Sequence, residues 1–97
     1  MFHQLVKENI ISVLIRIDSQ SRDDNITPDE FAKCAYAIQR LLDKIEVDFG
    51  TAFMVNVFKE ACEKAGHTIG PHTAGMIQKL TVLGFKVTGI NKVCHRK

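Results

Sequence analysis

Acidic residues are missing from the last third of this chain. All eleven Asp and Glu residues lie within residues 1–63, beside seven Lys and Arg, whereas residues 64–97 contain six Lys and Arg, three of the four histidines and no acid. The formal net charge of +2 therefore hides two segments of opposite sign. This division indicates either an acidic partner, protein or nucleic acid, or a basic segment that lies against the acidic part of the same chain.

Long apolar runs are also missing, and cysteine and proline are scarce. The apolar stretch at residues 9–17 is interrupted by Ser12 and Arg16, so we expect neither a signal peptide nor a membrane span. The 97 residues suffice for one hydrophobic core, and 45% hydrophobic residues are typical of a globular chain. An odd number of widely spaced cysteines predicts reduced thiols in a cytoplasm, and the three are Cys34, Cys62 and Cys94.

Apolar residues recur at helical spacing in four segments of the chain. We therefore predict an all-α fold, a single four-helix domain over residues 1–97. The expected helices cover residues 2–17, 28–46, 49–65 and 71–83, and a short basic tail or strand follows over residues 85–97.

Local signals predict where these helices begin and end. Residues 27–30, Thr-Pro-Asp-Glu, form a capping box with proline at the first helical position. Asp48 is expected to cap the third helix and Gly66 to end it. Pro71 is expected to lie in the first turn of the fourth helix. The polar residues 18–27 are interpreted as a loop.

The first predicted helix has more apolar surface than one packing contact requires. A second strip, which includes Leu5, Ile11 and Ile15, adds to a regular stripe at helical spacing. We interpret the stripe as an association face for a homodimer or another partner, and its residues are Val6, Ile10, Val13 and Ile17.

Residues 19–31 resemble the calcium loop of an EF-hand, with Ile26 at the central hydrophobic position and Glu30 at the last ligand position. Two residues depart from that pattern. Ser19 stands where the first acidic ligand is normal, and Asp24 replaces the glycine of the sharp turn. Because the capping box accounts for Glu30 without an ion, we expect no calcium site.

The remaining candidates for chemistry do not form a motif. The possible zinc ligands lack paired spacing, and they are Cys62, His67, His72, Cys94 and His95. Serine and cysteine nucleophiles have no recognisable base nearby, and glycine-rich phosphate loops are absent. We therefore expect a chain without enzymatic activity, metal or cofactor.

The segment over residues 58–97 is similar to the second half of a winged helix-turn-helix domain. It has a helix, a glycine turn at Gly66, a second helix containing Gln78 and Lys79, and a basic end. The resemblance implies a helix in the major groove of DNA and a wing on phosphate. Gly75 departs from it, since glycine weakens a recognition helix, and few side chains there suit base readout.

Gly70-Pro71, between the last two predicted helices, is the remaining feature. An exposed Gly-Pro bond suits the active site of a cyclophilin-type prolyl isomerase, although a proline that begins a helix explains it as well. With the small size and the apolar first helix, the turn resembles phage-encoded proteins that modify a host enzyme, among them the anti-RecBCD type. That resemblance implies RecBCD, the host recombination nuclease and helicase, and a prolyl isomerase as partners.

The function predicted from these features is a non-enzymatic protein-binding modulator or inhibitor of a host enzyme complex in the cytoplasm. The alternative is a DNA-binding regulator of the winged helix-turn-helix type. The residues expected to contact the partner are Gly70, Pro71, Lys86, Lys92, Arg96 and Lys97.

Overall fold

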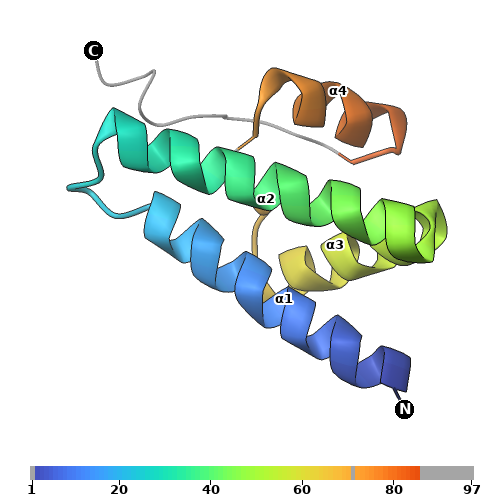
Figure 1. The fold of residues 1–97 in the computed structure, drawn as a ribbon. Coiled ribbons are helices and arrows are strands. Elements are labelled where there is room, and N and C mark those ends of the chain that lie inside the picture. The colour runs from blue at the N-terminus through green and yellow to red at the C-terminus, as the bar shows by residue number, and fades with distance from the viewer. Residues whose placement is uncertain (1, 71, 86–97) are drawn as a thin grey trace.

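Helices are the regular elements of the structure. The computed structural model describes residues 2–70 and 72–85, and in these it contains four helices and no strand. They are α1 (Phe2–Ser21), α2 (Pro28–Phe49), α3 (Thr51–Ala65) and α4 (Ala74–Val82) (Figure 1). The predicted all-α fold class is confirmed. The predicted basic tail or strand lies outside the described residues, apart from Phe85.

Five helix boundaries differ from those predicted, at the ends of α1, α2 and α4 and at the starts of α3 and α4. α1 continues past Ile17 to Ser21, with Asp18 and Ser21 of its last turn buried, so the loop predicted over residues 18–27 is wrong at residues 18–21. Asp48 lies inside α2, where it pairs with Lys44 at 3.3 Å, so its assignment as a cap is wrong. α4 begins at Ala74 and not at Pro71, which itself lies outside the described residues.

Side-chain caps hold the starts of α2 and α4. The Thr27 hydroxyl accepts the Glu30 N–H at 3.1 Å, and the Glu30 carboxylate accepts the Thr27 N–H at 3.1 Å, which confirms the predicted capping box. The Thr73 hydroxyl accepts the Met76 N–H at 3.1 Å at the start of α4. These caps satisfy backbone donors that the first helical turn leaves without partners.

A single glycine joins α2 to α3. Gly50 has φ +97° and ψ 163°, a region that is essentially restricted to glycine. Its N–H donates to the Glu46 carbonyl at 2.9 Å, and its carbonyl accepts the Met54 N–H at 3.1 Å. The chain therefore ends one helix and begins the next without a loop, and α3 folds back beneath α2 (Figure 1).

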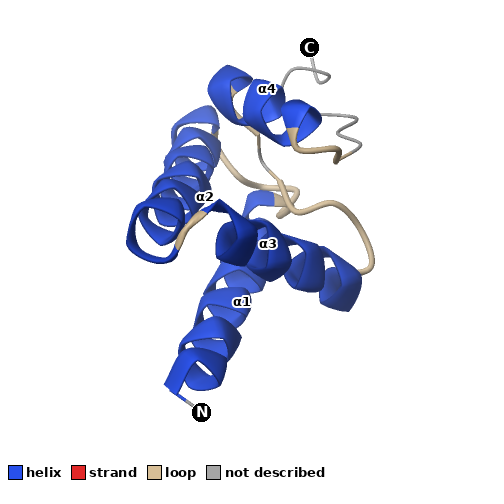
Figure 2. Cartoon of the chain, turned by 90° about the vertical axis from the view of Figure 1, so that its right-hand side faces the viewer, coloured by secondary structure: helices blue, strands red, loops and turns tan. Residues whose placement is uncertain are grey.

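The helices form layers, with α2 and α3 between α1 and α4 (Figures 1 and 2). α1, α2 and α3 all pack against one another. Every helix contributes apolar side chains to one core, and the residue between α3 and α4 that joins them is Ile69. The buried members are Ile11, Leu14, Ile38, Leu42, Ile45, Met54, Val57, Phe58, Ala61, Ile69, Met76 and Leu80.

The end of α4 returns to this core. Gly84 has φ +97°, its N–H donates to the Thr81 carbonyl at 3.0 Å, and the Phe85 N–H donates to the Leu80 carbonyl at 2.9 Å. This is the Schellman pattern of helix termination. It directs the Phe85 ring onto Phe58 of α3 in an edge-to-face contact, with ring centroids 5.0 Å apart. Among the described helices, none is long and apolar enough to cross a membrane.

Candidate functional site

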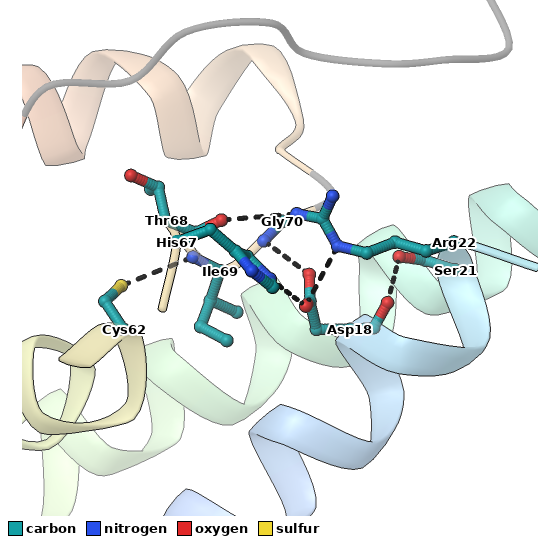
Figure 3. A network of polar contacts seen from close by, with 8 residues as sticks. All are labelled: Asp18, Ser21, Arg22, Cys62, His67, Thr68, Ile69 and Gly70. Atoms are coloured by element: carbon teal, nitrogen blue, oxygen red, sulfur yellow. Dashed lines mark hydrogen bonds and ion pairs between the residues drawn. The ribbon is translucent and has the colours of Figure 1, made fainter. Parts of the chain in front are cut away.

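Asp18 is the centre of a polar cluster at the end of α1. The residue is 2% exposed, and its Oδ2 accepts the Arg22 Nε–H at 3.1 Å and lies 2.7 Å from Nε2 of His67. Its Oδ1 accepts the backbone N–H of Gly70 at 2.9 Å (Figure 3). The buried carboxylate therefore has charged or polar partners at both oxygens, as a buried charge requires.

The cluster fastens the linker between α3 and α4, defined as residues 66–73. Besides the contacts to Asp18, Nη2 of Arg22 donates a hydrogen bond to the Thr68 carbonyl at 3.4 Å (Figure 3). The Ile69 N–H donates to Sγ of Cys62 at 3.3 Å. The Ile69 side chain is fully buried. The end of α1 thus fixes the path of the linker, and through it the position of α4.

His72 lies beside this cluster and is only 8% exposed. Its Nδ1 has no hydrogen-bond partner among the described residues. A Cβ added to Gly70 would lie 3.8 Å from two atoms of the His72 ring and 4.0 Å from Oδ1 of Asp18, so the ring packs close to the linker backbone. Burial lowers the pKa of His72 below its ordinary value of 6.5, against the opposing effect of Asp18.

The thiol in the cluster is not activated as a nucleophile. Burial raises the pKa of Cys62, an effect that the Ile69 N–H only partly opposes, so the group is protonated near neutral pH. In the described part of the chain, His, Cys, Asp and Glu form no group of three that could hold a metal ion. Of the zinc candidates, Cys94 and His95 lie outside that part. The contacts of the cluster are those of a structural clamp.

A cleft between α2 and α4 offers a surface of another kind. One cavity of about 250 Å³ combines four buried apolar residues with more exposed polar ones and Gly75. A second cavity of about 410 Å³ continues it along α4, since Gly75 and Lys79 line both. We call both together the α2–α4 cleft, and its residues are Gln39, Leu42, Asp43, Glu46, Met54, Gly75, Met76, Gln78, Lys79, Leu80, Val82 and Leu83.

Polar contacts connect the two helices across this cleft. Nζ of Lys79 lies 3.1 Å from Oδ1 of Asp43 and forms a second ion pair with Glu46. The hydrogen bond to Glu46 raises the pKa of Lys79, so the ammonium keeps its charge near neutral pH. At the start of α4 the Thr73 hydroxyl donates to Oε1 of Gln39. The basic third of the chain therefore does pair with the acidic part at Lys79.

Large apolar side chains are exposed near the cleft and elsewhere. Val82 lines the cleft and is 79% exposed, and Val47 on α2 is 83% exposed. Tyr36 on α2 and Leu5 on α1 are also exposed. Scattered exposed apolar residues are normal on a protein surface, so only those that line a cavity are considered as part of a binding site. Only Val82 belongs to the residues of the α2–α4 cleft.

The predicted association face on α1 is half-buried at all four positions, Val6, Ile10, Val13 and Ile17. The fully buried apolar residues of this helix are instead Ile11 and Leu14. Ile10 and Ile17 pack against the margin of the core. The face therefore keeps part of its surface exposed.

The predicted partner-binding residues fall mostly outside the described residues, where Pro71, Lys86, Lys92, Arg96 and Lys97 lie. Gly70 is described, and it is buried. Because its N–H donates inward to Asp18, the expectation of an exposed turn is wrong at this residue.

The geometry of the linker also departs from the winged helix-turn-helix pattern. The connection between α3 and α4 has eight residues, whereas the turn of that motif has three or four. Lys79, on the helix that would enter the groove, is engaged with α2.

Sequence reasoning missed both the clamp and the cleft. Ile11, Leu14, Asp18 and Ser21 share one helical face, so the spacing alone could have placed Asp18 toward the interior. The cleft has no such local signal, because its residues come from three helices. Protein-family models, curated proteins and solved structures gave no match to this chain.

Proposed function

We propose that the chain acts by binding another protein, as a modulator or inhibitor of a host enzyme complex, without chemistry of its own. The observation that carries this proposal is the α2–α4 cleft. It joins the buried side chains of Leu42 and Met54 to a charged margin and to the exposed Val82. Concave apolar surfaces with a few polar groups are typical binding sites for ligands and for the anchoring side chains of partners.

The charge of the chain suggests what the partner offers. The tail carries four Lys and Arg residues and no acid. For these, Lys86, Lys92, Arg96 and Lys97, we propose an acidic surface on the partner. The partly exposed face of α1 is a second contact surface, for the same partner or for another copy of the chain. The resemblance to anti-RecBCD proteins makes RecBCD the first complex to test.

A capture experiment with matched variants tests this proposal. The tagged chain is incubated with purified RecBCD and with a cytoplasmic extract, and both capture and nuclease rate are measured. Asp43→Lys should reduce capture, since it reverses a charge on the α2 side of the cleft, whereas Asp48→Lys makes the same change on the exposed surface of α2 outside the cleft. Replacing the four cations of the tail by Gln should also reduce capture.

Three results would count against the proposal. If no protein is captured and the nuclease rate is unchanged, the chain is not a modulator of this kind. Equal losses for the Asp43 and Asp48 variants would show that the cleft is not the contact surface. Affinity for duplex DNA that falls steeply with salt would favour the DNA-binding alternative instead.

A further inference from the structure

We infer that the groove on α2 and α3 beneath α4 is a helix-binding groove, with α4 as an exchangeable occupant that an amphipathic, lysine-bearing helix of a partner replaces. This inference deepens the proposed function and rests on it. It states which surface binds and what chemistry the partner brings.

The packing of α4 shows what the groove accepts. Met76 and Leu80, one helical turn apart, are 2% and 1% exposed and line the same cavity as Leu42 of α2 and Met54 of α3. Lys79, on the adjoining face, reaches the carboxylates of α2. The groove therefore takes apolar side chains at positions i and i+4 and a cation at i+3, the spacing of a helix laid in a groove.

The fit of α4 is incomplete. A cavity of about 250 Å³ remains between α4 and the two helices beneath it. Gly75 lines this cavity, and a Cβ at this position would meet no atom within 4 Å. An occupant with a larger side chain here would fill space that α4 leaves empty, and buried apolar contact adds to affinity.

α4 is also the helix whose exchange demands least from the rest of the fold. It has nine residues, and a helix of that length is marginal in water without its packing partners. The linker before it is fastened independently, through Asp18, Arg22 and Cys62. α1, α2 and α3 contact one another directly, and α4 covers them from one side (Figure 2). Release of α4 would leave these contacts in place.

The charges at the groove favour a basic helix as the occupant. Asp43 and Glu46 both face Lys79, and the hydrogen bond to Lys79 lowers the pKa of Glu46. The carboxylate of Glu46 is therefore ionised near neutral pH, and Asp43 lies beside it on the same ammonium group. An incoming helix without a cation at this position would leave the two like charges without the partner that they have in the resting structure.

The probe for this inference is a fluorescein-labelled synthetic peptide of residues 72–85, titrated with the full chain and followed by fluorescence anisotropy. In the wild-type chain, α4 competes at the millimolar effective concentration of a tethered segment, so binding should be weak. In the protein, Lys79→Glu places a third carboxylate beside those of Asp43 and Glu46. The repulsion among them should release α4 from the groove. The affinity of this variant for the peptide should rise by about tenfold, the scale of losing one exposed and one part-buried ion pair.

Matched variants separate this effect from general charge and folding effects. Lys64→Glu, at the exposed last turn of α3, should bind the peptide as the wild type does. Gly75→Leu should lower peptide binding, because it fills the cavity and holds α4 in place. A peptide that itself carries the Lys79→Glu change should not bind the wild-type groove, and it should bind a chain carrying Asp43→Lys and Glu46→Lys.

Peptide binding that is absent from every variant, or equal in all of them, would overturn the inference. Hydrogen exchange on the wild-type chain gives an answer that needs no variant. Amides of α4 should exchange by a local opening, faster than those of α2 and α3, and exchange of α4 only by global unfolding would contradict the inference. If a partner is captured but the peptide fails to bind, the proposed function stands and the groove is not its site.

Discussion

Asp18 illustrates how one buried charge organises this chain. It lies in the last turn of α1, and its carboxylate joins Arg22, just after that helix, to His67 and Gly70 of the linker. The four residues lie in two segments, residues 18–22 and 67–70, so these contacts bring together parts of the chain that are about fifty residues apart. Asp18 is 2% exposed and so is largely shielded from water, which makes each of these hydrogen bonds more consequential than it would be at the surface.

Replacing Asp18 by Ala should therefore destabilise the fold strongly. The change leaves the Gly70 N–H without its acceptor and should cost on the order of 3 kcal/mol. Unfolding in urea, followed by circular dichroism, measures this cost. Asp48→Ala is the matched control: it breaks the exposed pair with Lys44 and should change stability by about 0.5 kcal/mol or less. Similar costs at both positions would show that the cluster is not a clamp.

His72 should make the stability of the fold depend on pH. Burial lowers its pKa in the folded state below 6.5, so the unfolded chain binds a proton more readily than the folded chain does. The stability that neutral His72 contributes is complete above pH 6.5 and is lost as the pH falls through the lowered folded pKa. Asp18 favours the charged form and Arg22 opposes it, but burial dominates.

Thermal unfolding between pH 8 and pH 5 tests this dependence. The Tm of the wild-type chain should fall toward pH 5, and His72→Leu should reduce that fall because the buried group no longer titrates. His67→Leu serves as a comparison, since that ring is partly exposed beside Asp18. A His72→Leu chain with the full pH dependence of the wild type would assign the effect to other groups.

At the scale of elements, glycines decide where helices end. Gly50 turns the chain between α2 and α3, and Gly66 and Gly84 end α3 and α4, all three with positive φ. Gly75 differs, because it lies inside α4 and has no such φ. Two of these positions therefore form an informative pair, one where glycine is required and one where it is costly.

Gly50→Ala should destabilise the fold by about 1–3 kcal/mol, the cost of a side chain in a backbone region reserved for glycine. A Cβ at Gly50 would meet no atom within 4 Å, so the cost comes from the backbone alone. Gly75→Ala has equal space and should instead stabilise by about 0.5–1 kcal/mol, since alanine favours the helix. Urea unfolding of both variants measures the two signs, and a neutral Gly50→Ala would contradict the assigned strain.

The elements that sequence predicted well are those that local contacts determine. The capping box at Thr27 involves residues three apart, and the cap of α3 at Gly66 needs only its own helix. The start of α4 predicted at Pro71 was wrong because Thr73, a better N-cap, follows two residues later. The helix cap predicted at Asp48 was wrong because this residue pairs with Lys44 on the same helix, and the turn between the helices lies at Gly50.

The candidate sites were harder to predict than the elements. Asp18 is polar, and polarity suggested a loop, although its buried position depends on partners about fifty residues later in the chain. The α2–α4 cleft exists only once three helices are packed, so no local pattern encodes it. The tail residues stood out by their charge, but charge alone does not say what they bind.

At the scale of the whole molecule, basic residues of the last third of the chain contact acidic residues of the first two thirds. His67 contacts Asp18, and Lys79 contacts Asp43 and Glu46, so groups from the basic third reach acids on both α1 and α2. The first contact lies beside the linker and the second lies at α4. These polar contacts thus help to place the last layer on the first three helices, in addition to the apolar core.

The one-residue junction at Gly50 also fixes the rotational phase of α3 relative to α2. Each residue of an α-helix advances the side chains by about 100° around the axis. One residue inserted early in α3 would therefore rotate Met54, Val57 and Phe58 away from the core, with no loop to absorb the change. The exposed turn at residues 23–25, beyond Arg22 of the clamp, can absorb an added residue. Length changes in this chain are thus compatible with the fold between α1 and α2, and incompatible with it at the next connection.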